Sequence, residues 1–183
     1  MKRGFKSRAE QTADDIRKVM GLGAMERLDG TALAEHVGAE VRSADELIAL
    51  SKLEVLEATQ PGCFSACTFE IGERHVIVFN PLAAPGRRQS DLAHEASHLI
   101  LGHSVKQVQR IGELSFFTCD PDEEQEANWQ AGCLLLPRSL LVLAIRKGMD
   151  ADDIALAYEV STQMANYRIR TTGVLRQAGP KSK

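Results

Sequence analysis

Two histidines and a glutamate share one short apolar stretch, DLAHEASHLI, at residues 91–100. His94 and His98 are four positions apart, and Glu95 directly follows the first of them. On a helix, residues four apart differ by about 40° around the axis, and their Cβ atoms lie about 6 Å apart. Two imidazoles so placed can bind one zinc ion, while the neighbouring glutamate can take a proton from zinc-bound water. The pattern therefore predicts His94 and His98 as zinc ligands and Glu95 as catalytic base.

A third ligand must come from elsewhere, because His103 has the wrong spacing after the second histidine for the metzincin arrangement. The stretch CDPDEEQEANWQAGCLLLP offers several carboxylates. Asp120 and Glu123 form a D-x-x-E capping pattern, which begins a helix and fixes its register. In that register Glu124 shares a stripe with alanines and leucines, where a carboxylate is costly to bury unless it is paired or binds a metal. We predict Glu124 as the third ligand, with Glu126 as the fallback.

Asn128 lies four residues after Glu124 and shares its face of the predicted helix. Its side chain could hydrogen-bond a ligating histidine and so fix the tautomer of that ring. The predicted site is a His2Glu centre that holds one zinc ion per chain and keeps an open fourth position. Tyr158, Tyr167 and Arg168 are candidates to brace the oxyanion, but helix packing or a surface position explains them better, so the oxyanion donor stays unassigned.

Helices and a short β-rich section must position these residues. The apolar spacing predicts an amphipathic helix over 7–20 and a short helix that ends at Gly38, followed by the strand AEVRS. Between residues 53 and 81 the runs LEVLEAT, CFSACTFEI and RHVIVFN are separated by turn signals, which predicts a small antiparallel sheet. From there to the end we expect helices only.

Helical spacing predicts the later elements, with Ser90 as the N-cap of the helix that carries the histidines. The predicted helices cover 90–102, 120–136 and 138–147, with two shorter ones over roughly 150–172. The expected fold class is α+β, with a small antiparallel sheet packed on a mainly helical domain.

The composition suits one soluble domain. The chain has 183 residues, of which 44% are hydrophobic and 26% charged. We expect a single domain over 9–172 between flexible ends at 1–8 and 173–183. A formal net charge of -3 provides no general attraction for nucleic acids or anionic membranes. The basic opening is not followed by an apolar region, and no run approaches the length of a membrane span, so neither a signal peptide nor an anchor is expected.

The cysteines indicate a reducing compartment. Cys63, Cys67, Cys119 and Cys133 lie in a chain without a recognisable export signal, where reduced thiols are the rule. Their spacing fits a structural zinc site poorly, so we interpret them as buried thiols of a cytoplasmic protein.

Several motifs in order resemble those of the ImmA/IrrE family of zinc metallopeptidases, over about residues 10–172. They are VIVFNP, the arginine-rich approach in RRQSDLAHEASHLILGH, EQEANWQAGCLLLP, and YEVSTQMANYRI, which puts Arg168 at the family's arginine. The sequence departs from the family's pattern at Ser97, where glycine is common, and at NWQA, where N-x-F-A is common. Neither departure touches a predicted ligand, although the second can reshape the pocket wall.

The resemblance implies a zincin-like fold, with zinc held by His94, His98 and Glu124 and with Glu95 as base. It also implies a cytoplasmic protein, encoded by a bacterium or a phage, that cleaves a protein substrate. In this family the substrate is typically a helix-turn-helix repressor, and its cleavage derepresses stress or mobile-element genes.

Two other hypotheses about function stay open at this point. The stretch DIALAYEVSTQMANYRIR resembles a DNA-binding helix-turn-helix, but Glu159 replaces the usual turn glycine and the charges over 150–183 nearly cancel. We therefore expect no direct contact with nucleic acid, and none with a membrane. Alternatively, the protein keeps the zinc site but acts without cleaving, as an antitoxin-like or regulatory binding protein. The oligomeric state is left open.

Overall fold

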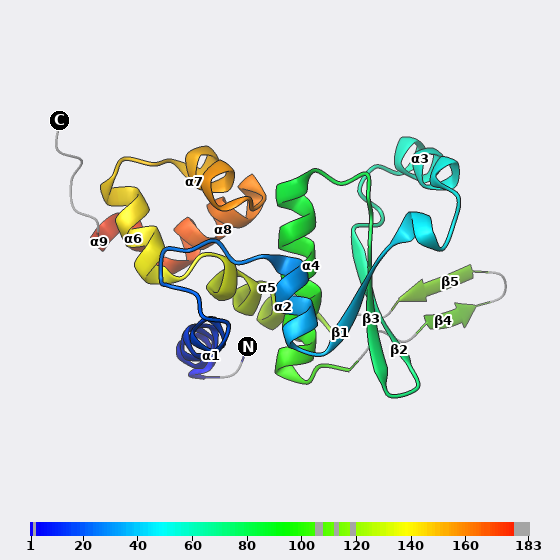
Figure 1. Ribbon diagram of the computed structural model, residues 1–183, viewed down its shortest axis with the longest axis horizontal. Helices are drawn as coiled ribbons and strands as arrows, with labels where there is room; N and C mark the ends of the chain where they lie inside the picture. Colours follow the sequence, from blue (N-terminus) through cyan, green and yellow to red (C-terminus); the bar gives the residue numbers. More distant parts are fainter. Residues whose placement is uncertain (2, 105–107, 112–113, 118–119, 178–183) are drawn as a thin grey trace.

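The computed structural model describes residues 1, 3–104, 108–111, 114–117 and 120–177, and Figure 1 shows its helices and strands. In chain order the elements are α1 (Phe5–Val19), α2 (Gly30–His36), β1 (Ala39–Ser43), the 3-10 helix η1 (Ala44–Glu46), α3 (Leu50–Thr59), β2 (Ala66–Ile71), β3 (Arg74–Phe79), α4 (Pro85–Leu101), β4 (Val108–Ile111), β5 (Leu114–Phe117), α5 (Pro121–Leu135), α6 (Arg138–Arg146), α7 (Ala151–Tyr158), α8 (Thr162–Thr172) and α9 (Val174–Gln177).

The main sheet has the strand order β1-β3-β2. Strand β2 is antiparallel to β3, as predicted, whereas β1 is parallel to β3, with Val41 opposite Ile77. The α+β class is confirmed, but the expectation of a purely antiparallel sheet is wrong. The strand AEVRS itself is as predicted, but its direction depends on the crossover through α3 and β2, which local patterning does not encode.

The run LEVLEAT, which we expected to be β-rich, belongs instead to α3. Leucine, glutamate and alanine favour helices, and here they outweigh the single valine and threonine. Leu53 is the buried residue of α3. A second difference is the antiparallel pair β4 and β5, in a segment where we expected helices only. Its valine, isoleucine and phenylalanine residues favour strands.

The boundaries of the two site helices differ in how well they were predicted. Helix α5 begins as expected, because the Asp120 carboxylate caps it by accepting from the Asp122 N–H. Helix α4 begins at Pro85 rather than at Ser90, since proline suits the first helical position. Ser90 is therefore no N-cap. Its hydroxyl donates to the Gly86 carbonyl and accepts from the Ser161 N–H, which ties α4 to the start of α8.

The folded part extends beyond the predicted boundaries at both ends. Helix α1 already begins at Phe5, whose side chain is buried, within the segment 1–8 that we expected to be flexible. At the other end α9 lies within the expected flexible segment 173–183, and Val174 is fully buried. The final residues of that segment, 178–183, lie outside the described residues.

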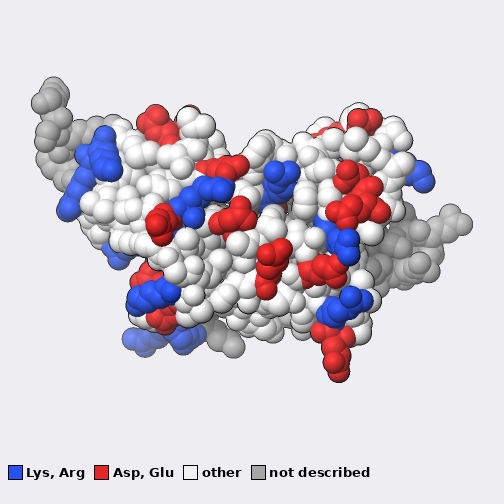
Figure 2. Space-filling model, in the orientation of Figure 1, with Lys and Arg blue, Asp and Glu red and all other residues white. Residues whose placement is uncertain are grey.

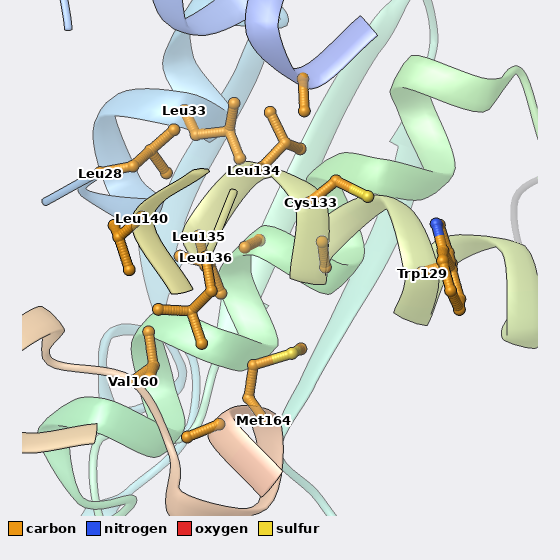
Figure 3. Close-up of a cluster of buried hydrophobic side chains, with 14 of the residues drawn as sticks. Leu28, Leu33, Trp129, Cys133, Leu134, Leu135, Leu136, Leu140, Val160 and Met164 are labelled. Atoms are coloured by element: carbon orange, nitrogen blue, oxygen red, sulfur yellow. The ribbon is translucent and has the colours of Figure 1, made fainter. Parts of the chain in front are cut away.

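Helix α4 lies between the sheet and the other helices: it packs on β2 and β3 on one side and on α2 and α5 on the others (Figure 1). Helix α1 packs along α5. Figure 3 shows the core that joins these elements, with leucines of α5 and the following turn at its centre. This packing fixes α4 and α5 side by side, which positions the predicted ligands.

Burial of the cysteines follows the prediction in part. Cys67 and Cys133 are buried, and burial raises the pKa of the Cys133 thiol to about 12. Cys63 is exposed, so the expectation of a buried thiol is wrong there. Cys119 lies outside the described residues.

Within the described residues, no single helix is long and apolar enough to cross a membrane. Helices α5 and α6 taken together would be long and apolar enough, but a 58° bend separates them.

Candidate metal centre

Helix α4 presents His94 and His98 on one face, and their Nε2 atoms lie 3.1 Å apart. Because α5 packs beside α4, Glu124 reaches both rings. Its Oε2 lies 3.2 Å from His94 Nε2, and its Oε1 lies 3.6 Å from His98 Nε2. The potential ligand atoms of these three residues all lie within 4.8 Å of one another. The sequence predicted this trio, and the structure brings its members together.

The donor set fits a zinc ion. A tetrahedral zinc with bonds of about 2.1 Å holds its ligand atoms about 3.4 Å apart, close to the separations found between these nitrogen and oxygen atoms. Two imidazole nitrogens and one carboxylate also match the ligand types of His2Glu zinc sites.

Glu95 is buried beside this cluster, with 4% of its surface exposed. The Thr68 hydroxyl, on β2, donates to Glu95 Oε2 at 2.7 Å. Sequence reasoning did not identify Thr68, since the contact depends on how the sheet packs against α4. The alternation of side chains along β2 does not indicate it either, because it groups Thr68 with the polar Glu70, opposite the apolar Cys67 and Phe69.

Glu126, the alternative candidate for the third ligand, does not join the cluster. Its Oε2 lies 3.6 Å from Nε2 of His103, on the other side of His98. Asn128 is exposed, and its amide donates to the Glu124 backbone carbonyl at 2.8 Å. That bond links Asn128 to the turn that bears Glu124 rather than to a histidine ring. The predicted hydrogen bond from Asn128 to a ligating histidine stays a prediction.

The chain reverses after α4 and places His103 against His98, with their Nδ1 atoms 3.0 Å apart. The sequence prediction gives His103 no part in the site, because its spacing does not fit a metzincin ligand. The signal that could have found it is Gly102, which ends the helix in the left-handed conformation with φ 66°.

A cavity of about 410 Å³ opens over the cluster, and His94, Glu95 and Glu124 line it. Arg87 and Asp91 lie on its wall as an ion pair, with the Arg87 Nε 2.9 Å from Asp91 Oδ2. Burial raises the pKa of Asp91, and the Arg87 guanidinium opposes this shift.

Of the oxyanion candidates, Tyr167 lines this cavity, and burial raises the pKa of its phenol. Trp129 belongs to NWQA, the segment that departs from the family's N-x-F-A pattern. It packs edge-on against Tyr167, with ring centroids 6.3 Å apart, so it helps to shape the pocket wall. Arg168 lies in the core, where Nη2 bonds the Leu136 carbonyl and Glu10. Tyr158 is partly buried against the core.

Ser97, the other departure, is fully buried, and its hydroxyl donates to the Ala93 carbonyl at 2.7 Å. The extra polar group is thereby satisfied within α4. It leaves the positions of the two histidines intact.

The segment that resembles a helix-turn-helix forms part of the cavity wall. Helix α8 buries Met164, Ala165 and Arg168, while Gln163 and Arg170 on the same helix line the cavity wall. A recognition helix would instead present a free face to DNA. On the face shown in Figure 2, acidic and basic side chains are interspersed rather than gathered into a basic patch.

The H-E-x-x-H pattern on α4 and the carboxylate of Glu124 on α5 form a cluster that could hold a metal ion, and its residue types match those of HExxH metallopeptidases. Residues 55–170 match the Peptidase_M78 family model, described as the IrrE N-terminal-like domain. This match covers more than half of the chain, so the protein belongs to that family, and the resemblance to ImmA/IrrE peptidases is confirmed. The match begins at residue 55, so α1, α2 and β1 lie outside it. No curated protein and no solved structure gives a significant match.

Proposed function

We propose that this protein is a zinc-dependent endopeptidase that hydrolyses a peptide bond in a protein substrate. The observation that carries the proposal is the convergence of His94, His98 and Glu124 beside the buried Glu95, at the floor of a cavity. Membership of a peptidase family also supports it.

In this mechanism His94, His98 and Glu124 hold the ion. A zinc ion held there would polarise the substrate carbonyl and lower the pKa of a bound water toward about 7. Glu95 is placed to act as the base, which takes a proton from the attacking water and passes it to the leaving amine. The Thr68 hydroxyl, which donates to Glu95 Oε2, holds the carboxylate in place for this transfer.

Tyr167 is the phenol on the cavity wall, and we propose it as the donor to the oxyanion. Burial raises the pKa of its hydroxyl, which therefore stays protonated at neutral pH and keeps a hydrogen to donate. Replacement by phenylalanine removes that donor and retains the packing against Trp129.

We further propose that the substrate is a helix-turn-helix repressor in the cytoplasm of a bacterium or of a phage-infected cell. This proposal depends on the family resemblance. Cleavage of such a repressor would derepress stress or mobile-element genes.

The test begins with the zinc content of the purified protein beside a His98→Ala variant, measured by elemental analysis. We expect close to one zinc per wild-type chain and a loss in the variant. The zinc-loaded protein is then incubated with the helix-turn-helix repressor whose gene lies nearest to its own gene. Fragments of the repressor are identified by mass spectrometry.

Glu95→Gln is the decisive control, because it leaves the three ligands intact and removes the base. We expect it to retain zinc and to produce no fragments. If the Glu95→Gln protein still exerts the biological effect of the wild type, the protein acts by binding alone and the peptidase proposal is wrong.

A further inference from the structure

The ring of His98 has a polar neighbour at each nitrogen. Nε2 faces the metal cluster, 3.1 Å from Nε2 of His94. Nδ1 lies on the opposite side of the ring, 3.0 Å from Nδ1 of His103. The exposed fractions of the His98 and His103 side chains are only 11% and 7%, so the contact between them is shielded from water.

The end of α4 explains why His103 lies there. Gly102 adopts the left-handed conformation, its N–H bonds the Leu99 carbonyl at 3.1 Å, and the His103 N–H bonds the His98 carbonyl at 3.0 Å. This is the hydrogen-bond pattern of the Schellman motif, in which the residue after the glycine packs on the residue five positions earlier. That contact is usually between apolar side chains. Here two imidazoles occupy it, with ring centroids 5.1 Å apart.

The other side of His103 faces a carboxylate. Its Nε2 lies 3.6 Å from Oε2 of Glu126, on α5. This separation is longer than a direct hydrogen bond, but a small rotation of the glutamate side chain would close it. Glu126, His103 and His98 thus form a chain of polar groups, and His98 is the predicted zinc ligand at its end.

A single arrangement of protons satisfies this line. A histidine that binds metal through Nε2 carries its hydrogen on Nδ1, so His98 donates to His103. His103 must then offer a lone pair at Nδ1 and carry its own hydrogen on Nε2, which faces the acceptor Glu126. Metal-ligating histidines nearly always donate their second ring N–H to such a partner.

We propose that His103, supported by Glu126, is a positioning residue for His98. It holds the ring in the tautomer and orientation that direct Nε2 to the metal. The inference rests on the proposed zinc site. His103 is not itself placed as a ligand, since the nitrogen nearest to the cluster faces Nδ1 of His98.

The test measures the zinc affinity of the full-length protein by competition with a chromophoric chelator. His103→Leu removes the acceptor and retains the apolar contact that helix ends of this kind favour, and we expect zinc affinity to fall by about 10- to 100-fold. His103→Asn places an amide near the position of Nδ1 and should recover most of that loss. The absorption spectrum of the cobalt-loaded protein should change in His103→Leu, because the ring of His98 is reoriented.

Glu126 and Glu123 provide a matched pair, since both lie near the start of α5 and both line a cavity of about 620 Å³ that His103 also lines. Glu126→Gln should weaken zinc binding several-fold, whereas Glu123→Gln should leave it unchanged. This comparison decides the question even if His103→Leu does not fold, which thermal unfolding of the metal-free variants would show. Equal affinity in the two glutamine variants overturns the inference.

The outcomes separate the two proposals. If the wild type binds no zinc, both the metal site and the role of His103 are wrong. If the wild type binds zinc and a folded His103→Leu variant binds it equally well with an unchanged cobalt spectrum, only the role of His103 is wrong. Weaker binding with recovery in His103→Asn supports it.

Discussion

Thr68 and Glu95 lie on a strand and a helix, and the threonine hydroxyl donates to the glutamate carboxylate at 2.7 Å in a buried setting. The main sheet thereby contacts the proposed catalytic base directly. We predict that Thr68→Val, which keeps the side-chain shape and removes the donor, lowers kcat by about ten- to a hundredfold, since a buried hydrogen bond to a charged group contributes roughly 1.5–3 kcal/mol and about 1.4 kcal/mol is a factor of ten. Steady-state cleavage of a verified substrate measures this effect.

Thr68→Ser is the matched control, because serine retains the hydroxyl. It should keep most of the activity, and the zinc content of both variants should equal that of the wild type. A Thr68→Val enzyme with unchanged kcat would show that Glu95 needs no support from the sheet.

Zinc should join α4 to α5 and stabilise the fold, because its ligands come from both helices. At a free zinc concentration about 100 times Kd, binding to the folded state alone adds about 2.7 kcal/mol to the free energy of unfolding. Thermal unfolding with zinc and with a chelator should therefore differ in midpoint for the wild type. Glu124→Ala should lose most of this difference, whereas Glu123→Ala should keep it. A zinc-dependent shift of equal size in Glu124→Ala would argue against Glu124 as a ligand.

The accuracy of the sequence predictions depended on how local each feature is. His94 and His98 share a face through helical periodicity alone, and the cap at Asp120 set the register that turned Glu124 toward them. The contact of Thr68 with Glu95 requires the sheet to pack on α4, which no short pattern encodes.

The same distinction explains two further differences. His103 reaches His98 because the chain reverses at Gly102, and the spacing rule for a metzincin ligand did not consider a contact to the back of the ring. The parallel direction of β1 depends on a long crossover rather than on its own residues.

Asp91 should make the stability of the metal-free protein depend on pH. Burial raises its pKa in the folded state above the value in the unfolded chain, despite the Arg87 partner. As pH rises from acid, the unfolded chain therefore loses the proton first, and stability falls until the pH exceeds the folded-state pKa. Asp91→Asn removes this effect.

The expected result is a stability gain for Asp91→Asn over the wild type that is near zero below the unfolded-state pKa of about 3.9, grows as the pH rises above it, and levels off once the pH exceeds the folded-state pKa. Urea unfolding of both metal-free proteins across this range measures the gain. A constant difference at all pH values would mean that lost contacts with Arg87, rather than the buried charge, determine the effect.

Gly132 on α5 packs directly against the side chain of Arg168, and a Cβ there would overlap its Cδ. Glycine to alanine inside a helix normally stabilises by up to about 1 kcal/mol. Here Arg168 is fully buried and held by the Leu136 carbonyl and Glu10, so it cannot easily move aside. We therefore predict that Gly132→Ala destabilises the protein by about 1–3 kcal/mol, as overpacking of a core does.

A double-mutant cycle identifies the cause, because the clash needs both side chains. In an Arg168→Met background the more slender and flexible side chain gives way, and Gly132→Ala should then be neutral or stabilising. Urea unfolding of the four proteins gives the coupling energy. Equal destabilisation by Gly132→Ala in both backgrounds would place the clash elsewhere along α5, and it would remove the reason for a glycine opposite this buried arginine.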